Sequence, residues 1–132
     1  MSSKADPPPS AQALLSIAQD AYANLPDNLL QAAQGVVILV KEFPDEEIQR
    51  ELGLDSPYDL LGLYEGVSML DKSVLDTPIS PDTVTLYRQP ILDYWQEGTD
   101  SLDHLVRHVL IHEIGHHFGL SDDDMARVEE TD

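Results

Sequence analysis

Apolar residues near the start of the chain recur at the spacing of a helix. Over residues 11–24 they return every three or four positions, which predicts an amphipathic helix with one face on the core. Ser10 is a suitable N-cap for this helix, and Pro26 ends it. A second, short helix is predicted over about residues 27–34, where Gly35 stops it.

Three short segments have the composition of β-strands. Residues 36–40 form a continuous apolar run rich in valine, which predicts a central strand covered on both faces. Residues 60–67 predict a second strand, in which Gly62 and Gly66 indicate a bulge or a close approach of the backbone to a neighbour. Residues 83–88 alternate and are β-branched, which predicts a third strand.

The segments between these elements are polar or irregular. Residues 45–52 predict one or two helical turns, and residues 53–59 and 68–82 predict loops. Residues 91–95 predict an irregular or helical segment.

The longest apolar pattern lies over residues 101–118. Its apolar positions cover well over half of the circumference of a helix, which indicates a helix buried in the middle of the protein. Thr99 or Asp100 is the expected N-cap, and Gly119 fits the position after the last turn. Helices followed by strands and then by helices predict an α+β domain, with a small mixed sheet of about three strands beside this long helix.

Composition limits the organisation of the chain. Its 132 residues fit one domain, over residues 10–132, after a proline-rich and disordered tail at residues 1–9. The chain has no cysteine, so any metal site must use histidine and carboxylate ligands.

The net charge of −18 argues against nucleic acid or an anionic membrane as a partner. It is compatible with basic substrates, although solubility is the simpler explanation. There is no apolar run of about 18 residues and no apolar core of a signal peptide near the N-terminus, so a cytoplasmic protein is expected.

Four histidines occupy the polar stripe of the long helix. They recur every four residues, at His104, His108, His112 and His116. Residues 112–116 read H-E-x-x-H, in which the two histidines lie one turn apart on the same face and can hold one zinc ion. The sequence therefore predicts His112 and His116 as metal ligands.

A catalytic zinc site needs a third protein ligand and one open position. Gly119 can take a positive φ and turn the chain back toward the metal, so that Asp122 reaches the ion. Asp123, Asp124 and Glu129 remain alternatives, because adjacent aspartates also form an ordinary acidic first turn of a helix.

Other polar residues near the motif have expected roles. Glu113 follows the first ligand and is the expected general base, with an ion pair inside the helix as its alternative role. His117 lies off the ligand stripe and is expected to be structural. His108 either contacts substrate or is partly exposed, and His104 is expected to be solvated.

Carbonyl hydrolysis also needs a donor for the developing oxyanion. Tyr64, Tyr87 and Tyr94 are the candidates, and each is equally compatible with a packing role.

Three blocks of the chain resemble the small bacterial zincin-like metallopeptidases, which are described as minimal metalloproteases. Residues 60–67 resemble that family's G-x-Y-x-G block, and residues 82–92 resemble its block of a strand followed by proline. Residues 109–122 resemble its extended motif, H-E-x-x-H-x-x-G-x-x-D. The resemblance covers about residues 12–130.

The resemblance implies a compact zincin-like α+β domain that hydrolyses peptide bonds with Zn²⁺. It also implies His112, His116 and Asp122 as ligands and Glu113 as the catalytic carboxylate. Peptides or small proteins are the expected substrates, bound along the strand edge at residues 62–67. Two alternatives remain: a metal-binding interaction module with little or no proteolysis, and a hydrolase of another amide or ester.

Overall fold

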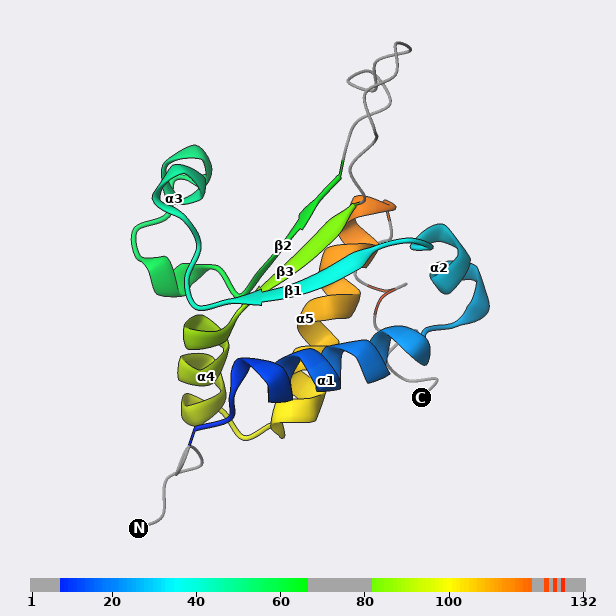
Figure 1. The fold of residues 1–132 in the computed structure, drawn as a ribbon, viewed down its shortest axis with the longest axis horizontal. Helices are drawn as coiled ribbons and strands as arrows, with labels where there is room; N and C mark the ends of the chain where they lie inside the picture. Colours follow the sequence, from blue (N-terminus) through cyan, green and yellow to red (C-terminus); the bar gives the residue numbers. More distant parts are fainter. Residues whose placement is uncertain (1–7, 67–81, 120–122, 124, 126, 128–132) are drawn as a thin grey trace.

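The computed structural model describes residues 8–66 and 82–119, together with residues 123, 125 and 127. In chain order the elements are α1 (Ala11–Ala23), α2 (Asp27–Ala32), β1 (Val37–Lys41), α3 (Glu46–Leu52), the 3-10 turn η1 (Pro57–Asp59), β2 (Gly62–Glu65), β3 (Thr83–Tyr87), α4 (Arg88–Glu97) and α5 (Leu102–His117). Figure 1 shows the strands lying together above α1 and beside α5. The predicted α+β class, with a small mixed sheet next to one long helix, is confirmed.

The three strands form one sheet in the order β1-β3-β2. Strand β1 pairs with β3 in parallel, and β2 pairs with β3 in antiparallel orientation. The central strand is β3, and the prediction that residues 36–40 form it is wrong, because β1 lies at an edge with Val37 and Leu39 about two-fifths exposed. A continuous apolar run does not distinguish the two positions, because pairing partners rather than composition place a strand within a sheet.

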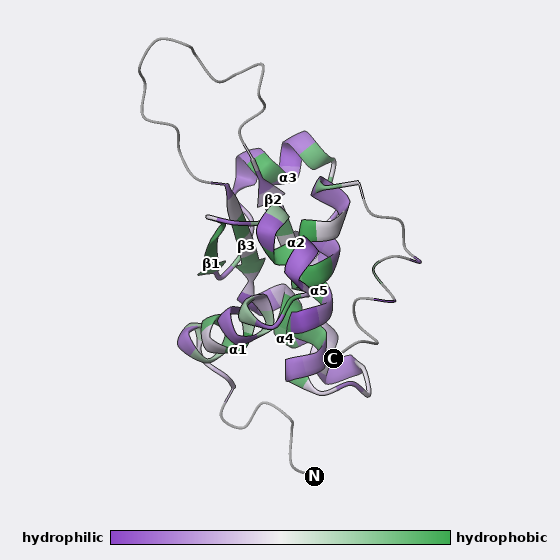
Figure 2. Cartoon of the chain, turned by 90° about the vertical axis from the view of Figure 1, so that its right-hand side faces the viewer, coloured by the Kyte–Doolittle hydropathy of each residue, from purple (hydrophilic) through white to green (hydrophobic). Residues whose placement is uncertain are grey.

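One face of the sheet packs against α1 and α5, which also contact each other. Hydrophobic residues dominate β1, whereas polar and apolar residues alternate along α1 (Figure 2). The fully buried core side chains of this packing come from α1, β3 and α5 and include Leu14, Val84, Leu110, Ile111 and Ile114. The long helix is therefore held from two sides, as its apolar pattern predicted.

The helix ends agree with most of the capping predictions. The Ser10 hydroxyl caps α1 by accepting the N–H of Ala13 at 3.1 Å. The cap of α5 is Ser101, rather than the predicted Thr99 or Asp100, because the Ser101 hydroxyl accepts an N–H from the first turn.

The connecting segments differ in detail from their predictions. Residues 91–95 lie inside α4, and the predicted loop at residues 53–59 contains η1. The tail at residues 1–9 and the loop at residues 68–82 lie outside the described residues, apart from residues 8, 9 and 82. None of the helices in the described part of the chain is long and apolar enough to cross a membrane.

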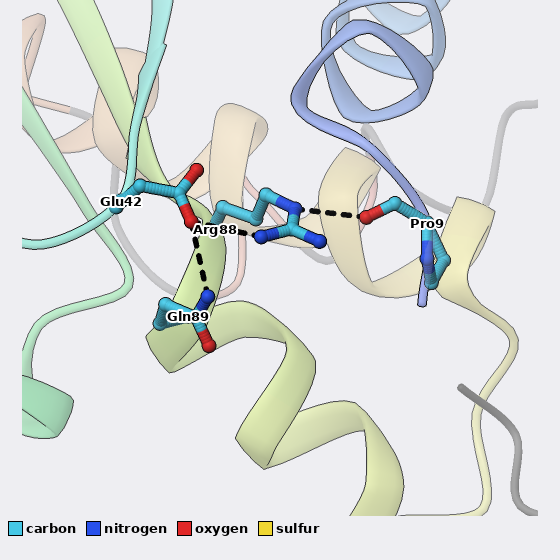
Figure 3. A network of polar contacts seen from close by, with 4 residues as sticks. All are labelled: Pro9, Glu42, Arg88 and Gln89. Carbon is cyan, nitrogen blue, oxygen red and sulfur yellow. Dashed lines mark hydrogen bonds and ion pairs between the residues drawn. The ribbon is translucent and has the colours of Figure 1, made fainter. Parts of the chain in front are cut away.

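A polar network at the start of α4 ties the N-terminal segment to the sheet (Figure 3). The Arg88 guanidinium donates through Nε to the carbonyl of Pro9 and through Nη1 to Glu42 Oε1, both at 2.8 Å. The Gln89 amide donates to the same Glu42 oxygen at 3.0 Å. Arg88 thus joins three segments that are distant in sequence.

The Glu42→Gln variant is expected to lower the free energy of unfolding at pH 7 by about 1 kcal/mol or less, since the ion pair is partly exposed. Hydrogen bonds from Gln89 and Arg88 hold the pKa of Glu42 below its usual value of 4.5. The Glu42 carboxylate therefore stabilises the fold above pH 4.5, and this contribution is lost as the pH falls through the lowered pKa. Urea unfolding of both proteins at pH 7 and pH 3.5 tests this, with the exposed Glu47→Gln as control. If the difference in the free energy of unfolding between the wild type and Glu42→Gln were the same at both pH values, the proposed role of the Glu42 carboxylate would be contradicted.

Candidate metal centre

Helix α5 presents the predicted histidine ligands on one stripe. His112 is half-buried and His116 is exposed, and their ring centroids lie 5.7 Å apart with ring planes at 88°. One turn earlier, the His108 ring lies 4.0 Å from the His112 ring. The two predicted ligands therefore lie next to each other, as the i, i+4 spacing requires.

The distance between the two ring centroids is compatible with two imidazoles on one zinc ion. Zinc binds imidazole nitrogen at about 2.0–2.1 Å, so two rings that converge on one ion place their centroids roughly 5–6 Å apart. Among the described residues, no group of three His, Cys, Asp or Glu side chains converges on one point. Asp122, Asp124 and Glu129 lie outside the described residues, whereas Asp123 is exposed on a helical segment. The identity of the third ligand stays a prediction.

The Glu113 carboxylate lies half-buried between α5 and β2. Burial raises the pKa of Glu113 above its usual value. A hydrogen bond from the backbone N–H of Tyr64 and the proximity of His116 oppose this shift. A raised pKa makes the carboxylate a stronger base, which suits a proton acceptor.

The register of β2 explains why the Tyr64 N–H reaches this carboxylate. Tyr87 donates its N–H to the carbonyl of Leu61 at 2.9 Å, and Gly62 pairs with Leu86. Backbone groups of an antiparallel strand point alternately toward and away from the partner strand. Those of Tyr64 therefore point away from β3, toward the outer edge of the sheet.

Glycines let β2 lie directly against α5. A Cβ at Gly62 would lie 2.8 Å from Val109 Cγ1, and a Cβ at Gly66 would lie 2.8 Å from His117 Cε1. The predicted close approach of the backbone is thus confirmed for both glycines. Together with the Tyr64–Glu113 bond, these contacts pair every second residue of the strand with every fourth residue of the helix. The two steps have similar lengths, roughly 6.6 Å along the strand and roughly 6 Å along the helix.

Side-chain contacts hold the same register at the end of β2. The Tyr64 ring stacks on His117 with centroids 3.9 Å apart, and its hydroxyl donates to Asp82 Oδ2 at 2.8 Å. The structure thus places His117 in the structural role expected from the sequence. The sequence reasoning missed the Tyr64 N–H and Asp82, and the G-x-Y-x-G spacing of residues 62–66 was the available signal.

The three candidate oxyanion donors occupy different environments. The Tyr64 hydroxyl is bonded to Asp82, and Tyr87 is 1% exposed, where burial raises its pKa to about 12. Tyr94 is 56% exposed on α4 and lines a hollow beside α5. The structure therefore places Tyr64 and Tyr87 in packing roles and leaves Tyr94 accessible.

A long histidine-bearing helix beside a three-stranded mixed sheet is the architecture of a zincin-like domain. A family model described as zincin-like metallopeptidase matches residues 33–131, well over half of the chain. The chain belongs to the zincin-like metallopeptidase family. None of the curated proteins compared with the chain matches it. Membership supports a metal-dependent hydrolase of the protease kind in general terms.

Proposed function

We propose that this protein is a cytoplasmic, zinc-dependent peptidase that acts on peptides or small proteins. The observation that carries the proposal is the half-buried Glu113 carboxylate, which accepts the N–H of Tyr64 on β2 and lies near His116 on α5. His112 and His116, with Asp122 as the third ligand, would hold the ion.

Different residues of the protein have different roles in the proposed hydrolysis. Zinc, when bound, would supply the Lewis acidity that activates water and polarises a carbonyl. Glu113 accepts the proton of the attacking water and returns it to the leaving amine. The Tyr64 N–H holds the carboxylate in one orientation through both transfers.

The outer edge of β2 is the proposed place for the substrate backbone. Gly62 is buried against α5 and the Tyr64 N–H is bonded to Glu113, so the accessible part of this edge begins at the Tyr64 carbonyl and continues to the exposed Gly66. An extended peptide that adds to this edge lies alongside α5, because strand and helix run next to each other over that length. The carbonyl groups of the bound peptide would then lie next to Glu113 and the histidines of α5.

Metal binding by this set tests the proposal. The purified protein is expected to contain one zinc per chain, and a strong chelator is expected to remove zinc and peptide cleavage together. His112→Ala and His116→Ala are each expected to weaken zinc binding by more than about 100-fold, beyond the loss typical for residues that only hydrogen-bond a metal ligand. Zinc added to the metal-free protein is expected to raise the melting temperature of the wild type but not of these variants. Mass spectrometry of the metal and thermal melting measure both effects.

His104→Ala is the matched control, because His104 lies on the same stripe two turns before His112 and pairs with Asp100. Asp122→Asn and Asp123→Asn compare two candidates for the third ligand, and only Asp122→Asn is expected to release zinc. Zinc affinity of both histidine variants equal to that of the wild type would overturn the proposed metal site. Tight zinc without cleavage of a broad peptide library would instead favour the metal-binding interaction module.

A further inference from the structure

A hollow of about 350 Å³ lies beside the histidine stripe, between the start of β2, the end of α4 and the first half of α5. Leu61, Leu105 and Val109 form its apolar part. Tyr94 and Asp100 bring an exposed phenol ring and an exposed carboxylate to it.

The hollow adjoins the metal centre through His108. This residue lines the hollow, and its ring lies 4.0 Å from that of His112. Four residues, about 6 Å, separate the two positions along α5, and an extended peptide advances about 3.3 Å per residue. A peptide beside β2 therefore brings to the hollow the side chain of a residue within about two positions of the bond near Glu113.

The lining of the hollow has the chemistry that an arginine side chain needs. Apolar side chains can cover its aliphatic stem, and the exposed Tyr94 ring at the hollow can stack on the planar guanidinium. The side chain of Asp100 is 62% exposed and lies 3.4 Å from His104 Nδ1, so its carboxylate can also accept a guanidinium N–H. No lysine or arginine is among the described residues that line the hollow. The net charge of −18 further favours a cationic group there.

We propose that this hollow binds an arginine side chain of the substrate near the cleaved bond, with Asp100 and Tyr94 as its specificity-determining residues. The proposal rests on the proposed peptidase function and adds its substrate class. Arginine is preferred over lysine, since a planar guanidinium stacks on an aromatic ring and bonds a carboxylate at the same time.

Binding to the zinc-loaded Glu113→Gln protein tests the subsite without turnover. Fluorescein-labelled alanine-based peptides carry one arginine, or its neutral isostere citrulline, at successive positions, and anisotropy at pH 8 gives Kd. At the best position the arginine peptide is expected to bind about five-fold more tightly than the citrulline peptide, as for a partly exposed ion pair. Adding Asp100→Asn is expected to reduce this ratio to below about two, and adding Tyr94→Leu is expected to reduce it partly.

Asp103→Asn is the matched control, because it removes the same charge from the first turn of α5 without lining the hollow. Thermal melting of each variant establishes that it is folded. Equal binding of arginine and citrulline peptides at every position, or a ratio that Asp100→Asn leaves unchanged, would overturn the subsite.

Cleavage of the same peptides by the zinc-loaded wild type separates this proposal from the proposed function. An arginine preference in binding that depends on Asp100, without any cleavage, would support the subsite and overturn the peptidase. Cleavage that shows no preference for arginine over citrulline would support the peptidase and overturn the subsite.

Discussion

Replacing Glu113 with glutamine is expected to lower kcat for peptide hydrolysis by about 10²–10⁴-fold, the usual contribution of a positioned acid–base group. The amide oxygen of glutamine can still accept the Tyr64 N–H, so the side chain keeps its place while it loses its basicity. Zinc content and KM are expected to change little, because Glu113 is not among the predicted ligands. Steady-state kinetics and metal analysis of the same preparations measure the three quantities.

Asp103→Asn is the matched control for this variant. Asp103 is an exposed carboxylate in the first turn of α5, and its replacement makes the same change of charge on the same helix. Its kcat is expected to stay within about two-fold of the wild type, as for an exposed substitution outside the catalytic groups. If the Glu113→Gln variant kept more than about a tenth of the wild-type kcat, Glu113 would not be the general base.

The Gly62→Ala variant is expected to lose about 1–3 kcal/mol of folding free energy, the typical cost of overpacking a core. The new Cβ would lie 2.8 Å from Val109 Cγ1 and 3.4 Å from the carbonyl oxygen of Thr85. Either the Val109 side chain turns, which a β-branched residue in a helix disfavours, or β2 and α5 move apart. That movement would also shift the Tyr64 N–H away from Glu113. A lower kcat is therefore expected together with the lower stability, because small displacements of catalytic groups are costly.

A double-mutant cycle isolates the contact behind this prediction. Val109→Ala is expected to destabilise by leaving a cavity, whereas Gly62→Ala with Val109→Ala is expected to cost less than the sum of the two, with a coupling of about 0.5–3 kcal/mol. Gly98→Ala is the control, because a Cβ there meets only the Tyr94 carbonyl oxygen at an ordinary 3.5 Å. If the changes in the free energy of unfolding were strictly additive, the contact with Val109 would not be the reason that a glycine is needed at position 62.

Periodicity and spacing along the chain were sufficient to predict the elements and part of the site. The apolar pattern predicted α1, the long α5 and the three strands, since burying one face of each element is a local requirement. The four-residue spacing of His112 and His116 placed both rings on one stripe, because the helical repeat alone sets that geometry. Gly119 has the positive φ of 77° that was expected after the last turn of α5.

Tertiary packing decided what depends on partners distant in sequence. Only the pairing of β1 with β3 placed residues 36–40 at a sheet edge, because an apolar run carries no information about its neighbours. Only the tertiary packing of β2 on α5, at Gly62, Tyr64 and Gly66, brings the Tyr64 N–H to Glu113. The hollow beside His108 likewise exists only because three elements meet there. The sequence by itself thus determined which residues of α5 could carry the chemistry, and the tertiary structure decided what faces them.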